Sequence, residues 1–306
     1  MNNFKEQFRI PSEEPTPGIY GKSDSFRLHW DINTYCDKDC FYCYARKQLV
    51  WNKMSTKTVL DDILTQLKNM DDKELEVVLL GGEPSLHPLY FYILDELEKL
   101  PNLLGSAVIS NAGRKVNTEW IDKHSKYKKF WFNYSFHPSE TEDIYDGFLN
   151  KVLYTRSKYK NVVVNILLIG PKWEDKIRAA VNFCRDNDIC IRANVLYNPK
   201  TCDDYLHKNT KYKEWISSYS EEFERYLHFR TNDNIIETLN DIDVYLRDLN
   251  MFKGWSCLNN NYAIEGSNNT KITRMCDKSQ SGQYMTCSLD RCICQGLLTN
   301  KKIKNA

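Results

Sequence analysis

Three cysteines lie close together early in the sequence, in the stretch YCDKDCFYCYA at residues 35–45. Cys36, Cys40 and Cys43 follow the spacing Cx3Cx2C, which does not supply the two CxxC pairs of a zinc finger. Three thiolates are one short of closing a tetrahedral metal site. They suffice, however, for three irons of a [4Fe–4S] cluster and leave the fourth iron open to an external ligand. We therefore predict an incompletely ligated iron–sulfur cluster here, with a zinc site as the alternative.

A second stretch with chemical potential is LLGGEP at residues 79–84, which ends an apolar run. Glycine lets the backbone approach a ligand closely, because it has no Cβ. The carboxylate of Glu83 suits an ammonium group as its partner. This turn is therefore a candidate for binding a ligand with an amino group.

These two motifs together resemble the radical S-adenosylmethionine (SAM) superfamily, in which an aromatic residue such as Tyr42 precedes the last cysteine and a GGE motif closes the second strand. The resemblance implies that the cysteines hold a [4Fe–4S] cluster whose open iron binds the amino and carboxylate groups of SAM. It also implies that the second stretch contacts the methionine part of SAM. The residues concerned are Gly81, Gly82, Glu83 and Pro84.

A third turn, VISNAGR at residues 108–114, ends another apolar run. Related enzymes often have a Thr-Asn-Gly-like turn near the ribose of SAM, and Ser110 and Asn111 are the matching polar groups. The alternative is an Asn-Ala-Gly turn with no contact to a cofactor.

The elements that must position these turns alternate between two patterns. Short β-branched or aromatic runs occupy 25–32, 75–80, 106–110, 129–136, 161–169 and 189–197. Stretches with helical periodicity lie between them, at 56–70, 87–99, 117–127, 143–158 and 173–187. This alternation predicts an α/β fold with a parallel sheet, either doubly wound or a partial barrel, and its active site at the carboxyl ends of the strands. With the family resemblance we expect a partial (β/α)6 TIM-type barrel.

Polar residues interrupt the later strands near their ends. A parallel strand buried on both faces normally reads as continuous apolar residues, so Ser135, Asn165 and Arg192 are candidates for lining the SAM pocket. A buried guanidinium needs an anionic partner, which could be a carboxylate of the cofactor, of the substrate or of a neighbouring Asp or Glu. His137 precedes Pro138 and lies either in the site or in a turn.

We divide the chain into a polar N-terminal extension (1–24), the barrel (25–200), a mainly helical connector (201–250) and a Cys-rich segment (251–306). The last segment contains a predicted hairpin around Gly266 and resembles the twitch or SPASM appendages of the family. The resemblance implies a second, auxiliary [4Fe–4S] cluster, with structural zinc as the alternative. Its expected ligands are Cys257, Cys276, Cys292 and Cys294, with Cys287 as a substitute or a bystander.

The composition narrows the class of protein. The 306 residues are 42% hydrophobic and carry a formal net charge of +1, which indicates a globular protein without an extended nucleic-acid surface. No run approaches eighteen apolar residues, so we expect no membrane span. The N-terminus lacks the apolar core of a signal peptide, which leads us to expect a reducing cytoplasm and eleven cysteines outside disulfides.

The resemblance implies an enzyme that cleaves SAM reductively to a 5′-deoxyadenosyl radical, which abstracts hydrogen from a substrate. We expect peptide or protein modification, with a small metabolite or nucleotide as the alternative substrate. The electron must come from an external low-potential donor of the flavodoxin or ferredoxin type. A non-enzymatic zinc-binding module is the remaining hypothesis.

Overall fold

The structure is a computed structural model, and it describes most of the barrel and parts of the C-terminal half. The described residues are 6–9, 25–43, 53–70, 72–195, 210–225, 227–231, 234–247, 249, 251–258, 261–274, 284–287 and 302–303.

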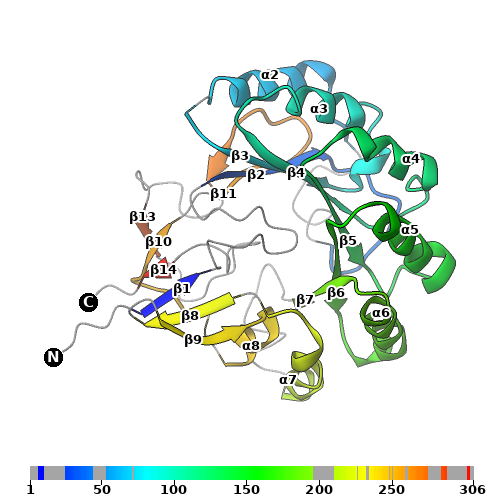
Figure 1. Ribbon diagram of the computed structural model, residues 1–306, viewed down its shortest axis with the longest axis vertical. Helices are drawn as coiled ribbons and strands as arrows, with labels where there is room; N and C mark the ends of the chain where they lie inside the picture. The colour runs from blue at the N-terminus through cyan, green and yellow to red at the C-terminus, as the bar shows by residue number, and fades with distance from the viewer. Residues whose placement is uncertain are drawn as a thin grey trace.

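Six parallel strands form the centre of the fold, as the strand–helix alternation predicts. They are β2 (Phe26–Asn33), β3 (Leu75–Gly81), β4 (Leu103–Ser110), β5 (Phe130–Phe136), β6 (Val162–Leu168) and β7 (Cys190–Val195). Each strand pairs in parallel with the next one along the chain. The strands curve around one side of the molecule with the helices outside them, which is the arrangement of a partial barrel (Figure 1).

The outer helices lie within their predicted ranges and are shorter than predicted. They are α2 (Lys57–Lys68), α3 (Tyr90–Leu97), α4 (Thr118–Asp122), α5 (Asn150–Lys158) and α6 (Glu174–Asp186). Thr56 and Asn117 cap the first turns of α2 and α4 by accepting hydrogen bonds from backbone N–H groups. The segment predicted as one helix at 143–158 begins with a π-helical turn, η3 (Tyr145–Leu149), before α5.

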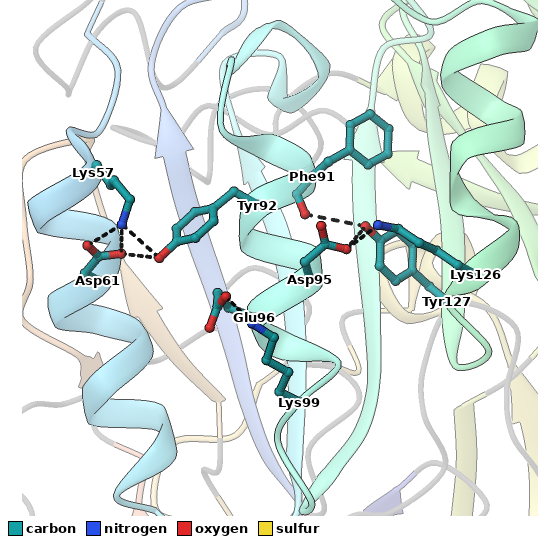
Figure 2. Close-up of polar contacts among 9 residues, drawn as sticks. All are labelled: Lys57, Asp61, Phe91, Tyr92, Asp95, Glu96, Lys99, Lys126 and Tyr127. Carbon is teal, nitrogen blue, oxygen red and sulfur yellow. Dashed lines mark hydrogen bonds and ion pairs between the residues drawn. The ribbon is translucent and has the colours of Figure 1, made fainter.

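Polar contacts on the outside connect neighbouring helices. The Lys57 ammonium contacts both the Asp61 carboxylate and the Tyr92 hydroxyl, which links α2 to α3 (Figure 2). On the other side of α3, Asp95 accepts hydrogen bonds from Lys126 and Tyr127 (Figure 2). These exposed contacts add to the packing of the helices, whose apolar faces cover the sheet.

The period of two along each strand separates the two faces of the sheet. On β2, Leu28, Trp30 and Ile32 are fully buried under the helices, whereas Arg27 and Asp31 belong to the inner face. The inner face carries a smaller apolar cluster, formed by Val78, Ala107, Trp131 and Val163. This apolar cluster therefore covers the inner face toward the amino ends of the strands, and polar side chains lie nearer the carboxyl ends.

A buried ion pair lies at the amino ends of the first two strands. The Arg27 Nε atom is 2.6 Å from Glu76 Oε2, and Ser25 Oγ donates to Glu76 Oε1 at 2.9 Å. Both charged side chains are almost fully buried. Each neutralises the charge of the other, which would be costly to bury alone.

The C-terminal segment contributes to the barrel sheet itself. The predicted hairpin is present as β11 (Asn261–Ile264) and β12 (Thr273–Arg274), which pair antiparallel. In addition, β11 pairs in parallel with β2, so the first barrel strand is not an edge of the sheet. An unpaired edge strand exposes backbone N–H and C=O groups, and β11 satisfies those of β2.

A second sheet has the strand order β13-β10-β14-β1-β8-β9. Its strands are β1 (Glu6–Arg9), β8 (Leu227–Thr231), β9 (Asn234–Leu239), β10 (Ser256–Leu258), β13 (Tyr284–Thr286) and β14 (Lys302–Ile303). The described part of the connector predicted at 201–250 contains the helices α7 (Thr210–Ser217) and α8 (Asp241–Leu246), and β8 and β9 lie between them. The sequence analysis did not predict these two strands, which form by pairing with each other and with the distant β1.

Candidate cofactor site

The cysteine loop follows β2 at the carboxyl end of the parallel sheet. Cys40 is buried, and Cys36 and Cys43 are partly buried. The backbone N–H of Cys43 donates to the Cys40 carbonyl oxygen at 3.0 Å, which makes a tight turn between two of the thiols. The three thiols therefore come from one compact loop at the edge where the active site of such a sheet is expected.

The GGEP turn is bonded directly to the start of this loop. Gly82 N donates to the Asn33 carbonyl oxygen at 2.9 Å, and Glu83 N donates to the Tyr35 carbonyl oxygen at 2.7 Å. The Asn33 side chain returns a hydrogen bond from Nδ2 to the Glu83 carbonyl oxygen at 3.0 Å. The bonded residues are 48 to 50 positions apart in sequence, so the fold places the two motifs side by side.

The two glycines allow the cysteine loop to approach the GGEP turn closely, a role that the sequence alone did not indicate. A Cβ at Gly81 would lie 2.0 Å from the Asn33 carbonyl oxygen, and one at Gly82 would lie 2.1 Å from the Tyr35 carbonyl oxygen. Gly81 also has φ +129°, which side-chain-bearing residues rarely adopt.

The Glu83 carboxylate points into the protein and is fully buried. Its Oε1 accepts hydrogen bonds from Ser85 N at 3.0 Å and Ser110 Oγ at 2.9 Å, and Oε2 accepts one from Asn111 N at 2.7 Å. Burial raises the pKa of Glu83, while these donors lower it. The carboxylate therefore fastens the turn at 110–113 to the GGEP turn, a role not expected from the sequence.

The 110–113 turn in turn contacts the cysteine loop. Asn111 Nδ2 is 3.4 Å from Cys36 Sγ and 3.0 Å from Asp37 Oδ1. The other Asp37 oxygen accepts from Arg114 N at 3.1 Å. Lys151 Nζ donates to the carbonyl oxygens of residues 112 and 113, each at 2.9 Å. The sequence analysis did not select Asp37, although its position next to Cys36 could have indicated it. It also did not select Lys151, which nothing in the sequence of its helix distinguishes from other lysines.

Tyr42 and His137 meet at the buried cysteine. The Tyr42 hydroxyl lies 2.9 Å from His137 Nδ1, which is also 3.5 Å from Cys40 Sγ. Burial lowers the pKa of His137 to about 4 and raises that of Tyr42, so both are neutral near pH 7. His137 thus belongs to the site, and the hydroxyl of Tyr42 faces protein groups.

The thiols of Cys36 and Cys40 keep their protons near pH 7 in the absence of a positive partner. Burial, with smaller contributions from nearby acidic groups, raises the pKa of Cys36 and of Cys40 to about 12. Iron binding requires thiolates, and a bound metal supplies the positive charge that makes a buried thiolate stable.

The donor set fits an iron–sulfur cluster. Besides Asn111 Nδ2, the backbone N–H of Lys38 donates to Cys36 Sγ at 3.4 Å, and hydrogen bonds of this kind stabilise cluster sulfurs. Within the described residues, no group of three or more His, Cys, Asp or Glu side chains is arranged to hold a single metal ion. In a cubane each thiolate binds a different iron, so the three thiols need not converge on one point.

The fit to a second ligand rests on Asn111. Its Oδ1 atom is buried and has no hydrogen-bond partner among the described residues. A buried acceptor without a donor is costly, so a hydroxyl of a bound ligand would satisfy it.

Three polar residues form a row across the inner face. In the strand register Ser135 lies opposite Asn165, which lies opposite Arg192. All three are partly exposed, unlike the fully buried apolar residues on the helix side of these strands. The structure therefore brings these predicted residues together on the face where a ligand would lie.

Asp31, on the inner face of β2, was not singled out from the sequence. Its Oδ2 accepts a hydrogen bond from Gly266 N of the C-terminal hairpin at 3.2 Å. Burial is the main cause that raises the pKa of Asp31 to about 7. This carboxyl group therefore connects the barrel to the C-terminal segment through a hydrogen bond.

The predicted auxiliary ligands are described in part. Cys257 lies on β10, and Cys287 directly follows β13, the strand paired with β10. Cys287 N donates to the Trp255 carbonyl oxygen at 2.8 Å, which continues this pairing. Cys276, Cys292 and Cys294 lie outside the described residues.

No helix in the described part of the chain is both long and apolar enough to cross a bilayer.

Comparison with known proteins adds a family and a fold. Residues 30–184 match the family model of the Radical SAM superfamily. A comparison with curated proteins finds no match.

Among solved structures, SuiB of Streptococcus suis bound to the precursor peptide SuiA is similar, with a TM-score of 0.50 and 19% identity over 65% of this chain and 46% of that chain. Native anSMEcpe with bound AdoMet and Cp18Cys peptide has a TM-score of 0.55 and 14% identity over 89% of this chain and 79% of that one. A histidine-tagged form of anSMEcpe with bound AdoMet has a TM-score of 0.51 and 13% identity over 65% of this chain and 60% of that one. The chain spans about half the length of the SuiB chain that it matches, and at these identities the likeness is one of fold.

Proposed function

Because the chain belongs to the radical SAM superfamily, an enzyme family that implies a [4Fe–4S] cluster and SAM, we propose that it uses both to modify a peptide or protein by hydrogen abstraction. The most direct support is that the GGEP turn and the 110–113 turn are both hydrogen-bonded to the cysteine loop. One cofactor can therefore touch all three turns.

In this proposal each part of the chain has a defined task. Cys36, Cys40 and Cys43 hold the cluster through three irons. When bound, the cluster and SAM supply the one-electron chemistry: SAM is cleaved reductively, and the resulting 5′-deoxyadenosyl radical abstracts a substrate hydrogen. The inner apolar layer below the site excludes water from that space.

The residues proposed to bind SAM come from four parts of the site. The 81–84 turn contacts the methionine part through its backbone, since the Glu83 carboxylate is already saturated by protein donors. Asn111 Oδ1 accepts a hydrogen bond from a ribose hydroxyl. The set also includes Tyr42, Gly81, Gly82, Pro84, Ser110, Ser135, Asn165 and Arg192.

A peptide substrate is supported by the similar structures. SuiB is bound to a precursor peptide in one of them, and anSMEcpe is bound to a Cp18Cys peptide in another. The peptide-bound anSMEcpe structure aligns with 89% of this chain, so the likeness extends beyond the barrel. We propose that the substrate lies on the inner face of the barrel, beside the polar row Ser135, Asn165 and Arg192.

We also propose a twitch- or SPASM-like auxiliary [4Fe–4S] cluster in the C-terminal segment. Its ligands are Cys257, Cys276, Cys292 and Cys294. The register that sets Cys257 opposite Met285 gives Cys287 the same face of the strand pair, so Cys287 is the substitute ligand. The low-potential electron comes from an external flavodoxin or ferredoxin, in a reducing compartment such as the cytoplasm.

The decisive experiment is anaerobic reconstitution with iron and sulfide, followed by mass-spectrometric detection of 5′-deoxyadenosine after adding SAM and dithionite. Replacing Cys36, Cys40 and Cys43 by Ala should abolish that product. Cys184→Ala is the matched control, because Cys184 is buried between helix and sheet, away from the loop. A triple variant that still cleaves SAM, or a colourless protein that binds zinc and no iron, would refute the proposal.

The auxiliary cluster has a separate test. Replacing Cys257 and Cys276 by Ala should lower the iron content by about four per chain, the number in one cubane. Unchanged iron in that variant, with zinc present, would assign zinc to this segment and leave the barrel cluster untouched.

The substrate class can be tested with the same protein. Incubation with candidate peptides should change the mass of at least one of them in the presence of SAM. If every peptide keeps its mass while a small metabolite or nucleotide is modified, the peptide assignment is wrong.

A further inference from the structure

The cysteine that is most buried in the loop has two polar neighbours from different elements. Tyr42 belongs to the loop, and His137 follows the end of β5. His137 Nδ1 is 2.9 Å from the Tyr42 hydroxyl and 3.5 Å from Cys40 Sγ. The three polar atoms therefore form one contact group.

The histidine is held in place from several sides. Its carbonyl oxygen accepts hydrogen bonds from Thr141 Oγ1 at 2.9 Å and from Glu140 N at 3.1 Å. The Tyr42 and His137 rings are nearly parallel, with an angle of 7° and 6.0 Å between their centres. The imidazole is thus fixed with Nδ1 toward the loop, so its contact with Tyr42 and Cys40 is a built feature.

Ligation of iron decides the direction of the hydrogen bonds. A metal-bound thiolate accepts hydrogen bonds and donates none, whereas a tyrosine hydroxyl does both and a neutral imidazole has one N–H. When Nδ1–H donates to the Tyr42 oxygen, the hydroxyl hydrogen can turn toward Cys40 Sγ, the sulfur that Nδ1 also approaches.

We propose that His137 and Tyr42 form a hydrogen-bond chain that donates to the Cys40 sulfur and raises the reduction potential of the cluster that this sulfur helps to hold. The inference rests on the proposed function. In this role the Tyr42 hydroxyl and His137 act through Cys40, as positioning groups, and the proposed SAM contact of Tyr42 belongs to the rest of that residue.

The physical reason is the change in charge on reduction. The reduced cluster is more negative, so a hydrogen bond to one of its thiolates stabilises the reduced form more than the oxidised form. The bond from His137 polarises the tyrosine hydroxyl and strengthens its bond to sulfur. The shift makes it easier for the cluster to accept an electron from an external donor.

The chain offers variants that separate this role from simple packing. Tyr42→Phe removes the hydroxyl and keeps the ring. His137→Asn retains an N–H near the position of Nδ1, whereas the longer side chain in His137→Gln carries its amide past that position. Tyr145→Phe is the matched control, because Tyr145 is 55% exposed and lies on η3.

The experiment is a redox titration of the reconstituted full chain. The reduced cluster is monitored through its EPR signal, which changes when SAM is added. At a fixed potential, Tyr42→Phe should lower the ratio of reduced to oxidised cluster about tenfold, which is 59 mV for a one-electron couple. His137→Gln should shift the ratio in the same direction, while His137→Asn and Tyr145→Phe should stay close to the wild type.

The outcomes are distinct. A Tyr42→Phe protein with full iron content and the wild-type potential would overturn the inference, as would equal potentials for His137→Asn and His137→Gln. If Tyr42→Phe fails to hold iron, the two histidine variants decide the matter. A wild-type protein without any SAM-responsive signal would instead contradict the proposed function itself.

Discussion

The junction between the GGEP turn and the cysteine loop makes a sharp prediction about Gly82. In Gly82→Ala the added Cβ would lie 2.1 Å from the Tyr35 carbonyl oxygen and 2.8 Å from the Thr34 carbonyl carbon. Both are backbone atoms, so neither can turn aside as a flexible side chain would. One of the two segments must therefore move.

The cost follows from the contacts that would be lost. Overpacking of a well-packed site costs about 1–3 kcal/mol. The movement also breaks the hydrogen bonds from Gly82 N and Glu83 N to the loop, each of about 1 kcal/mol. The free energy of unfolding should therefore fall by about 3 kcal/mol or more, which corresponds to a decrease in Tm of about 6 °C.

The control is Gly147→Ala. A Cβ at Gly147 would have its nearest neighbour, the Asp143 Cβ, at 3.9 Å, which is an ordinary contact. Because Gly147 lies in a helical turn, alanine there should leave stability unchanged or raise it by up to about 1 kcal/mol.

Two measurements check this prediction: thermal unfolding of the iron-free protein under anaerobic conditions, and iron content after reconstitution. Gly82→Ala should lower both, because the displaced loop no longer presents its three thiols together. The reasoning is wrong if Gly82→Ala matches Gly147→Ala in Tm and in iron content.

Three further predictions concern stability around the barrel. Burial raises the pKa of Asp31 from 3.8 to about 7, so the wild type loses up to about 4 kcal/mol as the pH rises from 4 to 7. Asp31→Asn should remove this loss and be the more stable protein at pH 8 but not at pH 4, and urea unfolding that shows a pH-independent difference would contradict the assignment. Lys151→Met leaves two carbonyl oxygens of the 110–113 turn without their donor and should lower the free energy of unfolding by about 1–3 kcal/mol and weaken SAM binding by calorimetry. Arg27→Leu should lower the free energy of unfolding by about 3–5 kcal/mol in chemical denaturation, because it leaves the buried Glu76 carboxylate without its partner. Adding Glu76→Leu should recover part of that loss, and a double variant less stable than the single one would refute the ion-pair argument.

Much of the barrel was predictable because its signals are local. The strands β2 to β7 are short β-branched or aromatic runs, and each helix between them shows the periodicity of one buried face. The order of pairing follows from this alternation, since sequential parallel strands joined by helices lie next to one another. The strands β8 and β9 were not predicted because they are short and depend on pairing, in part with the distant residues 6–9.

Part of the site was also predictable. The spacing of Cys36, Cys40 and Cys43 predicts three thiols on one short loop, and the structure has them there. The role of Glu83 was not predictable, because its donors come from residues 85, 110 and 111 and only folding brings them to it. The same is true of Lys151, which bonds to carbonyl oxygens nearly forty residues away.

The sequence alone determined which residue types this protein has for its chemistry, and which strand each of them follows. A residue type and its distance from a strand end are properties of the chain, and they persist in any fold that keeps that strand. Only the tertiary structure decided that the glycines make room for the cysteine loop, that Glu83 faces inward and that His137 meets Cys40. Those facts depend on backbone and side-chain atoms within hydrogen-bonding or contact distance from segments far apart along the chain, and no local pattern encodes such a distance.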